Sequence, residues 1–152
     1  MIERKKTKEV RIGNVMVGGD HAVTVQSMTT TKTHDVTATL KEVERLEEAG
    51  CHLIRITVPD QPAADALKEI KKRMNVPLIA DIHFNYRMAL EAVDAGADKI
   101  RINPGNIGGK KKVKEVLDKV KGASLPIRIG DNAGSLEKDL IEKFGYPIPE
   151  AM

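Results

Sequence analysis

Residues 98–106 of the chain read DKIRINPGN, and Arg101 lies between two isoleucines in this segment. A short apolar run that ends at a Pro-Gly pair predicts a buried strand followed by a turn. Burying a guanidinium without a partner is costly, so the arginine needs a reason to be there. The tripeptide Ile-Arg-Ile occurs three times, at residues 54–56, 100–102 and 127–129. The repetition indicates one structural unit used several times.

Outward from this stretch, segments with strand-like and helix-like periods alternate along the chain. Residues 10–25 alternate apolar and polar side chains around Gly18 and Gly19, which predicts a hairpin leading into a first strand at 23–27. Further strands are predicted at 52–58, 76–84, 98–103 and 126–130. Helices are predicted at 36–49, 62–74, 86–95, 111–121 and 136–144.

Particular residues mark the helix ends and their buried faces. Asp35 and Ser135 are suited to N-caps, and Gly145 is suited to the position after a last helical turn. In the helix at 111–121 we expect Val113, Val116, Leu117 and Val120 to be buried. Cys51 follows a helix-ending glycine and is expected to pack as a small apolar side chain.

Five strand–helix units in succession predict parallel strands with helical crossovers. The polar residues at the strand centres are spaced 29, 26, 20 and 27 residues apart and are Gln26, Arg55, Asp81, Arg101 and Arg128. We therefore expect an α/β fold in which residues 1–152 form one domain, a partial TIM-type (β/α) barrel preceded by the hairpin. A closed eight-unit barrel needs about 250 residues. An open doubly wound sheet is the less favoured alternative, since it would bury arginines under a helix layer.

The composition narrows the function class. Hydrophobic residues make up 41% of the 152, which is typical of a globular protein. No apolar run approaches the ~20 residues of a membrane helix, so no membrane association is expected. The net charge of +3 is small and aromatic residues are few, so the composition does not favour a nucleic-acid-binding protein. A chain with a single cysteine can form no internal disulfide, and we therefore expect it in the reducing cytoplasm.

Residues two apart in a strand share a face, which places polar companions beside each strand-centre residue. We expect Arg55, Arg101 and Arg128 to converge at the carboxyl ends of the strands, with Asp81 and His83 between them. One carboxylate offsets only part of three guanidinium charges, and arginine forks match phosphate oxygens, so the expected ligand is a phosphate or diphosphate. The alternative is that each arginine faces outward and pairs with a helix carboxylate.

Two other motifs could form ligand-binding or catalytic sites. Residues 101–112, RINPGNIGGKKK, differ from a Walker sequence in spacing and in Lys111, and the lysines 110–112 are expected to form a solvated face. Whether Asn103 and Asn106 touch a ligand stays open. Asp81 and His83 could bind a metal, transfer a proton or form a hydrogen-bonded pair, and two ligands are too few for a metal site.

Five long segments of the chain, residues 12–31, 45–60, 77–92, 98–108 and 127–140, closely resemble the N-terminal region of the bacterial 4-hydroxy-3-methylbut-2-en-1-yl diphosphate synthase family. The resemblance implies an oxidoreductase of the non-mevalonate isoprenoid route that opens the ring of 2-C-methyl-D-erythritol 2,4-cyclodiphosphate reductively. It also implies a barrel followed by a domain that carries a [4Fe-4S] cluster, with flavodoxin or ferredoxin as electron donor.

Carried onto matching positions, the resemblance implies that Arg55, Arg101 and Arg128 hold the diphosphate. It implies that Asp81, Asn103 and Asn132 orient the substrate, with His83 and Ser135 nearby. It assigns no catalytic residue within this chain.

The chain departs from the family pattern at two points. It stops at residues 145–152, GYPIPEAM, so the rest of the barrel and the iron–sulfur domain are expected to be absent and the chain to be inactive alone, with no cofactor of its own. Asp131 stands where the family usually has an aliphatic residue. Unpaired strand edges predict a homo-oligomer that associates through residues 127–129. Two alternatives remain open: another phosphate-binding barrel enzyme, such as a pteroate-synthase-like protein, or a non-catalytic fragment or assembly module.

Overall fold

The computed structural model describes residues 5–131, 134, 136, 138–146 and 148–151. Within them, five parallel strands form one sheet in the order in which they occur along the chain, and a two-stranded antiparallel hairpin stands beside it. The hairpin strands are β1 (Val10–Ile12) and β2 (Val15–Val17), and the sheet strands are β3 (Gln26–Met28), β4 (Leu53–Thr57), β5 (Leu78–Ile82), β6 (Lys99–Ile102) and β7 (Ile127–Ile129).

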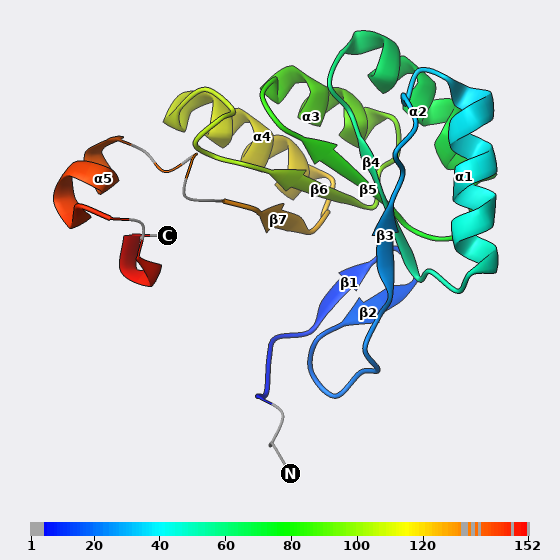
Figure 1. Cartoon of the computed structure of the whole chain (residues 1–152), viewed down its shortest axis with the longest axis horizontal. Helices are drawn as coiled ribbons and strands as arrows, with labels where there is room; N and C mark the ends of the chain where they lie inside the picture. Colours follow the sequence, from blue (N-terminus) through cyan, green and yellow to red (C-terminus); the bar gives the residue numbers. More distant parts are fainter. Residues whose placement is uncertain (1–4, 132–133, 135, 137, 147, 152) are drawn as a thin grey trace.

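The first four helices of the described chain all cover the same face of the sheet (Figure 1). They are α1 (Val36–Glu48), α2 (Gln61–Arg73), α3 (Tyr86–Asp94) and α4 (Lys110–Gly122). Helix α5 (Lys138–Phe144) and a 3₁₀ turn, η2 (Pro149–Ala151), stand away from this layer. Sequential strand order with helices on one face is the arc of a barrel, whereas a doubly wound sheet has helices on both faces. The prediction of a partial barrel is therefore confirmed.

Most predicted element bounds agree with the structure to within one or two residues. Asp35 caps α1 as expected, because its side chain accepts a hydrogen bond of 3.0 Å from the backbone N–H of Ala38. The α5 cap predicted at Ser135 lies outside the described residues.

The N-terminal hairpin and the first sheet strand differ from the prediction. The hairpin turns at Gly13 and Asn14, not at Gly18 and Gly19, and Gly13 has the positive φ of +56° that a tight two-residue turn requires. The first sheet strand begins at Gln26, three residues later than predicted.

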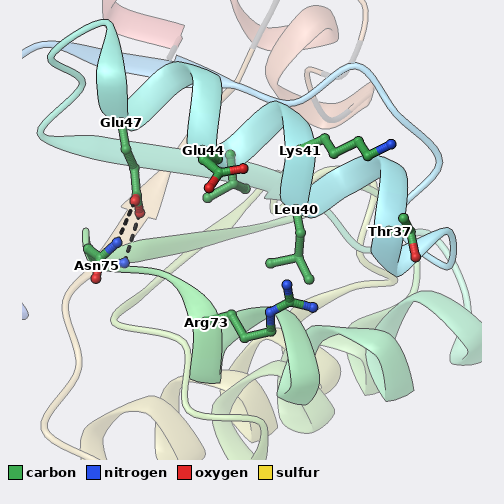
Figure 2. A pocket seen from close by; sticks show the side chains of 8 residues that line it. Thr37, Leu40, Lys41, Glu44, Glu47, Arg73 and Asn75 are labelled. Atoms are coloured by element: carbon green, nitrogen blue, oxygen red, sulfur yellow. Dashed lines mark hydrogen bonds between the residues drawn. The ribbon is translucent and has the colours of Figure 1, made fainter.

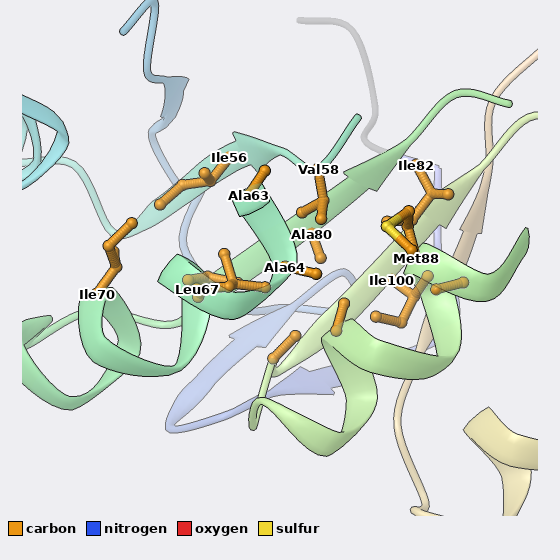
Figure 3. Close-up of a cluster of buried hydrophobic side chains, with 14 of the residues drawn as sticks. Ile56, Val58, Ala63, Ala64, Leu67, Ile70, Ala80, Ile82, Met88 and Ile100 are labelled. Carbon is orange, nitrogen blue, oxygen red and sulfur yellow. The ribbon is translucent and has the colours of Figure 1, made fainter. Parts of the chain in front are cut away.

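The main hydrophobic core lies between the sheet and the helices (Figure 3). Every second strand residue points into it, and the fully buried isoleucines are Ile54, Ile56, Ile82, Ile100 and Ile102. Leu67 and Ile70 of α2 meet them from the helix side and are 0% exposed. Burying one such side chain contributes about 1.5–3 kcal/mol. Cys51 is buried in the same cluster, which confirms its expected packing role.

A second, smaller core lies on the opposite face of the sheet, which is the inner face of the barrel arc. Ile12 of the hairpin packs there with Leu53 of β4 and Ile79 of β5, and Val15 and Val17 cover them. The hairpin therefore closes the amino end of the inner face with apolar side chains. The polar strand-centre residues are left for the carboxyl end.

Among the described residues, no helix combines the length and the apolar character needed to span a membrane.

Candidate functional site

The predicted site residues lie on the inner face because strand register aligns them. Asp81 of β5 is paired with Arg101 of β6, and Arg101 is paired with Arg128 of β7. On the other side, Asp81 is paired with Thr57, so Arg55 of β4 sits two residues lower on the same face. We call Arg55, Asp81, Arg101 and Arg128 the arginine layer.

Asp81 is the centre of the arginine layer and is only 2% exposed. Its Oδ1 accepts a hydrogen bond of 3.0 Å from Arg101 Nη1. Its Oδ2 lies 3.3 Å from Arg55 Nε and 3.3 Å from His83 Nε2. The Arg55 Nε contact has the distance of an ion pair but not the alignment of a hydrogen bond, since Nε is buried without a hydrogen-bond partner. One carboxylate thus serves three cationic or potentially cationic side chains.

Arg101 is held at both sides of its guanidinium group. Besides its bond to Asp81, its Nη2 donates a hydrogen bond of 3.3 Å to the carbonyl oxygen of Gly130, just after β7. A Cβ atom at position 130 would lie 2.6 Å from Arg101 Nη2. Glycine at 130 therefore provides the space in which the guanidinium lies, and the side chain is positioned before any ligand arrives.

Arg55 is the lower member of the layer. Its Nη2 lies 3.0 Å from the sulfur atom of Met28 on β3. The contact is a weak hydrogen bond, because a thioether sulfur is a poor acceptor. Arg55 keeps donor capacity that neither Asp81 nor Met28 uses fully.

Arg128 is the exposed member of the layer. It follows the register of Arg101, and the strand residues on either side of it, Ile127 and Ile129, point to the helix face. Its charge also reaches Lys99 of β6. Burial first, and then the positive charge of Arg128, lower the pKa of the Lys99 ammonium group.

Sequence reasoning missed Lys99, although a signal was present. Lys99 lies two residues before Arg101 and so shares its face. It is paired with Ile79, a residue of the smaller core, and is half-buried. A lysine at the start of a strand is commonly an exposed polar residue, but Lys99 lies on the inner face, level with Arg55 and two residues below Arg101.

The polar residues at the carboxyl ends of β5 and β6, His83 and Asn103, differ in exposure and in their contacts. Asn103 is 2% exposed, and its Oδ1 accepts a hydrogen bond of 3.1 Å from the Gly105 N–H, which shapes the turn after β6. The backbone N–H of Asn106 donates to the Asn103 carbonyl at 3.1 Å. His83 has a 40% exposed side chain and an edge-to-face contact with Phe84, with ring centroids 6.1 Å apart.

The other residues singled out from the sequence have different outcomes in the structure. Asn132 and Ser135 lie outside the described residues. Asp131 is half-buried. The lysines 110–112 are exposed at the start of α4, as expected for a solvated face, and Lys112 Nζ lies 5.5 Å from the ring centroid of Tyr86. The outward orientation considered for the arginines is not found for Arg55 or Arg101, which both meet Asp81.

A separate cleft lies on the helix side, between α1 and the end of α2 with the loop that follows it (Figure 2). It has a volume of about 290 Å³. In it, the carboxylate of Glu47 accepts hydrogen bonds of 2.8 Å and 2.7 Å from the backbone and side-chain nitrogens of Asn75. These bonds tie α1 to the loop before β5, which is a structural role. Its lining contains Lys41, Glu44 and Arg73 but no member of the arginine layer.

Comparison with known proteins identifies the family. Residues 7–152 match the family model described as the GcpE TIM-barrel domain. The proteins named 4-hydroxy-3-methylbut-2-en-1-yl diphosphate synthase (flavodoxin) from Anoxybacillus flavithermus and Geobacillus thermodenitrificans are each 59% identical over all 152 residues of this chain. The chain spans 42% and 41% of the lengths of these two relatives.

Solved structures with a similar fold include dihydropteroate synthases. The Yersinia pestis enzyme superimposes with a TM-score of 0.64 at 17% identity, over 90% of this chain and 52% of that one. The Xanthomonas albilineans enzyme gives a TM-score of 0.61 at 16% identity, over 89% of this chain and 56% of that one. At these identities the likeness shows the barrel fold alone. With the family match covering residues 7–152, the chain belongs to the GcpE family, whose TIM-barrel domain it matches.

Proposed function

We propose that this chain is the substrate-binding barrel portion of a 4-hydroxy-3-methylbut-2-en-1-yl diphosphate synthase. In this proposal the arginine layer binds the diphosphate of 2-C-methyl-D-erythritol 2,4-cyclodiphosphate, whose ring the whole enzyme opens reductively in the non-mevalonate route to isoprenoids. The observation that carries the proposal is the meeting of Arg55 and Arg101 on the buried Asp81, with Arg128 next to them in register.

The charges of the arginine layer support an anionic ligand. Asp81 supplies one negative charge against the guanidinium groups of Arg55, Arg101 and Arg128, so a net positive charge remains on the inner face. Phosphate oxygens accept paired hydrogen bonds from guanidinium forks and would offset this charge. Because Asp81 and Gly130 hold Arg101 in place, little side-chain entropy is lost when the ligand binds.

Residues at the rim would orient the rest of the substrate. The exposed His83 imidazole and the buried Asn103 amide lie at the carboxyl ends of β5 and β6, where barrel enzymes bind their substrates. The family resemblance adds Asn132 and Ser135 to this group. Each of these side chains would contribute hydrogen bonds, and the arginines would contribute charge.

The residues of this chain do not fit an iron–sulfur cluster. A [4Fe-4S] cluster is held by cysteine thiolates, and Cys51 is the one cysteine among the 152 residues. It is 8% exposed, in the core between sheet and helices and away from the inner face. Among the described residues no three His, Cys, Asp or Glu side chains are grouped as metal ligands. The proposal therefore assigns substrate binding to this chain and no redox step.

The names of the relatives specify flavodoxin, and we propose flavodoxin as the electron donor of the whole enzyme. The buried thiol of Cys51 supports a reducing cytoplasm as its location. We also propose that the chain forms homo-oligomers, because β3 and β7 are the edges of the five-stranded sheet.

Calorimetric titration with the cyclic diphosphate tests the proposed site. Arg101→Ala removes charge-assisted hydrogen bonds worth about 1.5–3 kcal/mol, so we expect affinity to fall by about tenfold or more. Lys110→Ala is the matched control, because Lys110 is an exposed cation at the start of α4. It should bind the ligand as the wild type does.

Two further measurements complete the test. Binding should weaken as salt is added, because charges on both partners make the contact. Thermal melts of each variant show whether it is folded before its affinity is compared. Equal losses in Arg101→Ala and Lys110→Ala would contradict the assignment of the site to the arginine layer.

A further inference from the structure

Lys99 is a cation that the proposed site does not yet use. It lies on β6, on the inner face, directly below Arg101 and next to Ile79 of the smaller core. Strand residues two apart are separated by about 6.6 Å. Arg55 of β4 is paired with the same residue, Ile79. Lys99 and Arg55 therefore form a deeper level of positive charge beneath Arg101 and Arg128.

No carboxylate of the described residues is paired with Lys99. Asp81 is the nearest candidate on β5, and its oxygens are taken by Arg55, Arg101 and His83. Arg101 on the same strand shares the inner face with Lys99, and Arg55 of β4 is paired with the same residue, Ile79. The charge of Arg128 on β7 also acts on Lys99. Ile79 itself belongs to the smaller core, together with Ile12 of the hairpin.

The surroundings of Lys99 disfavour its charged form. Burial and the charge of Arg128 lower the pKa of its ammonium group. An anion bound between Lys99 and the two upper arginines, Arg101 and Arg128, would relieve both effects. The flexible four-carbon stem allows the ammonium group to follow such a ligand.

We propose that Lys99 is a specificity-determining residue that contacts the deeper of two phosphoryl groups, so that the site prefers a diphosphate to a single phosphate. The proposal rests on the function proposed above and adds the residue that sets the substrate class. Arg101 and Arg128 would hold the outer phosphoryl group, and Lys99 would hold the inner one. A single phosphate engages Arg101 and Arg128 without reaching Lys99.

Calorimetry with inorganic pyrophosphate and with inorganic phosphate tests this assignment. Lys99→Met removes the charge and keeps an unbranched side chain of similar length. We expect its affinity for pyrophosphate to fall about tenfold or more and its affinity for phosphate to stay within about twofold, since loss of one charge-assisted contact costs about a factor of ten. Lys110→Met, on the exposed start of α4, is the control and should leave both affinities unchanged.

The outcomes separate this inference from the proposed function. If Arg101→Ala loses pyrophosphate while Lys99→Met binds it as the wild type does, the role of Lys99 is wrong and the arginine site stands. If neither variant changes the affinity, both are wrong. Equal losses of phosphate and pyrophosphate in Lys99→Met would show a general charge effect and would overturn the selectivity.

A measurement on the wild-type chain keeps the test valid if Lys99→Met does not fold. Lysine amines labelled by reductive ¹³C-methylation report their own titration by NMR, and the signal absent from Lys99→Arg belongs to Lys99. Pyrophosphate should raise the pKa of this amine, because the ligand adds negative charge beside it. Phosphate should raise it less. An unchanged pKa with saturating pyrophosphate would overturn the proposal.

Discussion

At the scale of single residues, Asp81 organises the inner face. It is nearly inaccessible to solvent, and its two oxygens hold Arg55, Arg101 and His83 in place. Such a group stabilises its partners only as long as it keeps its charge, since removing one member of a buried ion pair leaves the others uncompensated.

Asp81→Asn should lower the free energy of unfolding by about 3 kcal/mol, because two partly buried guanidinium groups lose their counter-ion. Urea denaturation monitored by circular dichroism measures the change. Asp118→Asn is the control, because Asp118 pairs with Lys114 on the exposed surface of α4, and it should leave the midpoint unaltered. A midpoint for Asp81→Asn equal to that of the wild type would mean that Asp81 does not stabilise the arginines.

The sequence was sufficient to predict that Arg55, Arg101 and His83 lie beside Asp81, but not how they contact it. Asp81, Arg101 and Arg128 occupy neighbouring register positions because the strands are parallel and consecutive, whereas Arg55 lies two residues lower on the same face. The sharing of one carboxylate depends on side-chain rotamers, which no spacing reveals. Lys99 was missed because a lysine at the start of a strand does not by itself show that it is half-buried next to Ile79.

At the scale of elements, the carboxylate of Glu42 fastens the loop after β3 to helix α1. It accepts hydrogen bonds from the N–H groups of Thr30 at 2.8 Å and Thr31 at 3.1 Å, and from the Thr30 hydroxyl at 2.9 Å. Burial alone would raise the pKa of Glu42, but the hydrogen bonds from Thr30 and Thr31 together outweigh it and lower the pKa.

The lowered pKa sets the direction of a pH effect. A carboxyl group with a depressed folded-state pKa contributes stability above its unfolded-state pKa, near 4.3, and loses it as the pH falls through the folded-state value. We expect Glu42→Gln to be less stable than the wild type at pH 7, and the difference to shrink below about pH 4. Chemical denaturation at a series of pH values measures this. A constant difference from pH 7 to pH 3 would contradict the role of the Glu42 charge.

Helix α4 shows why one predicted core residue is exposed. Val116 and Val120 are buried as expected, whereas Leu117 is 40% exposed, so that prediction is wrong. The apolar stripe of α4 is wide enough for neighbours on both sides. Helix α3 covers one side of α4, whereas α5 stands away from the layer (Figure 1). Leu117 is left uncovered and meets solvent.

At the scale of the whole molecule, the sheet is an arc with two edges. Strands β3 and β7 each pair on one side within the described chain. Val25, just before β3, is 51% exposed, and Ile129 of β7 is 54% exposed. Edge strands that present apolar side chains and unpaired backbone groups favour association.

Size-exclusion chromatography with light scattering should detect oligomers whose mass rises with protein concentration. Ile129→Lys places a charge at the β7 edge and should shift the population toward the monomer. Leu117→Lys is the control, because it adds the same charge at an exposed apolar position on a helix. A wild-type chain that stays monomeric at every concentration tested would contradict the proposed homo-oligomer.

The close approach of Arg101 to Gly130 makes these two positions epistatic. Position 130 lacks a side chain, and the guanidinium fills that space, so any larger residue there must displace an arginine that is anchored on both sides. In saturation mutagenesis screened for folding and not for ligand binding, single substitutions at 130 would be depleted, and they would return mainly together with a shorter residue at 101. Libraries that vary one position at a time would never recover such double variants.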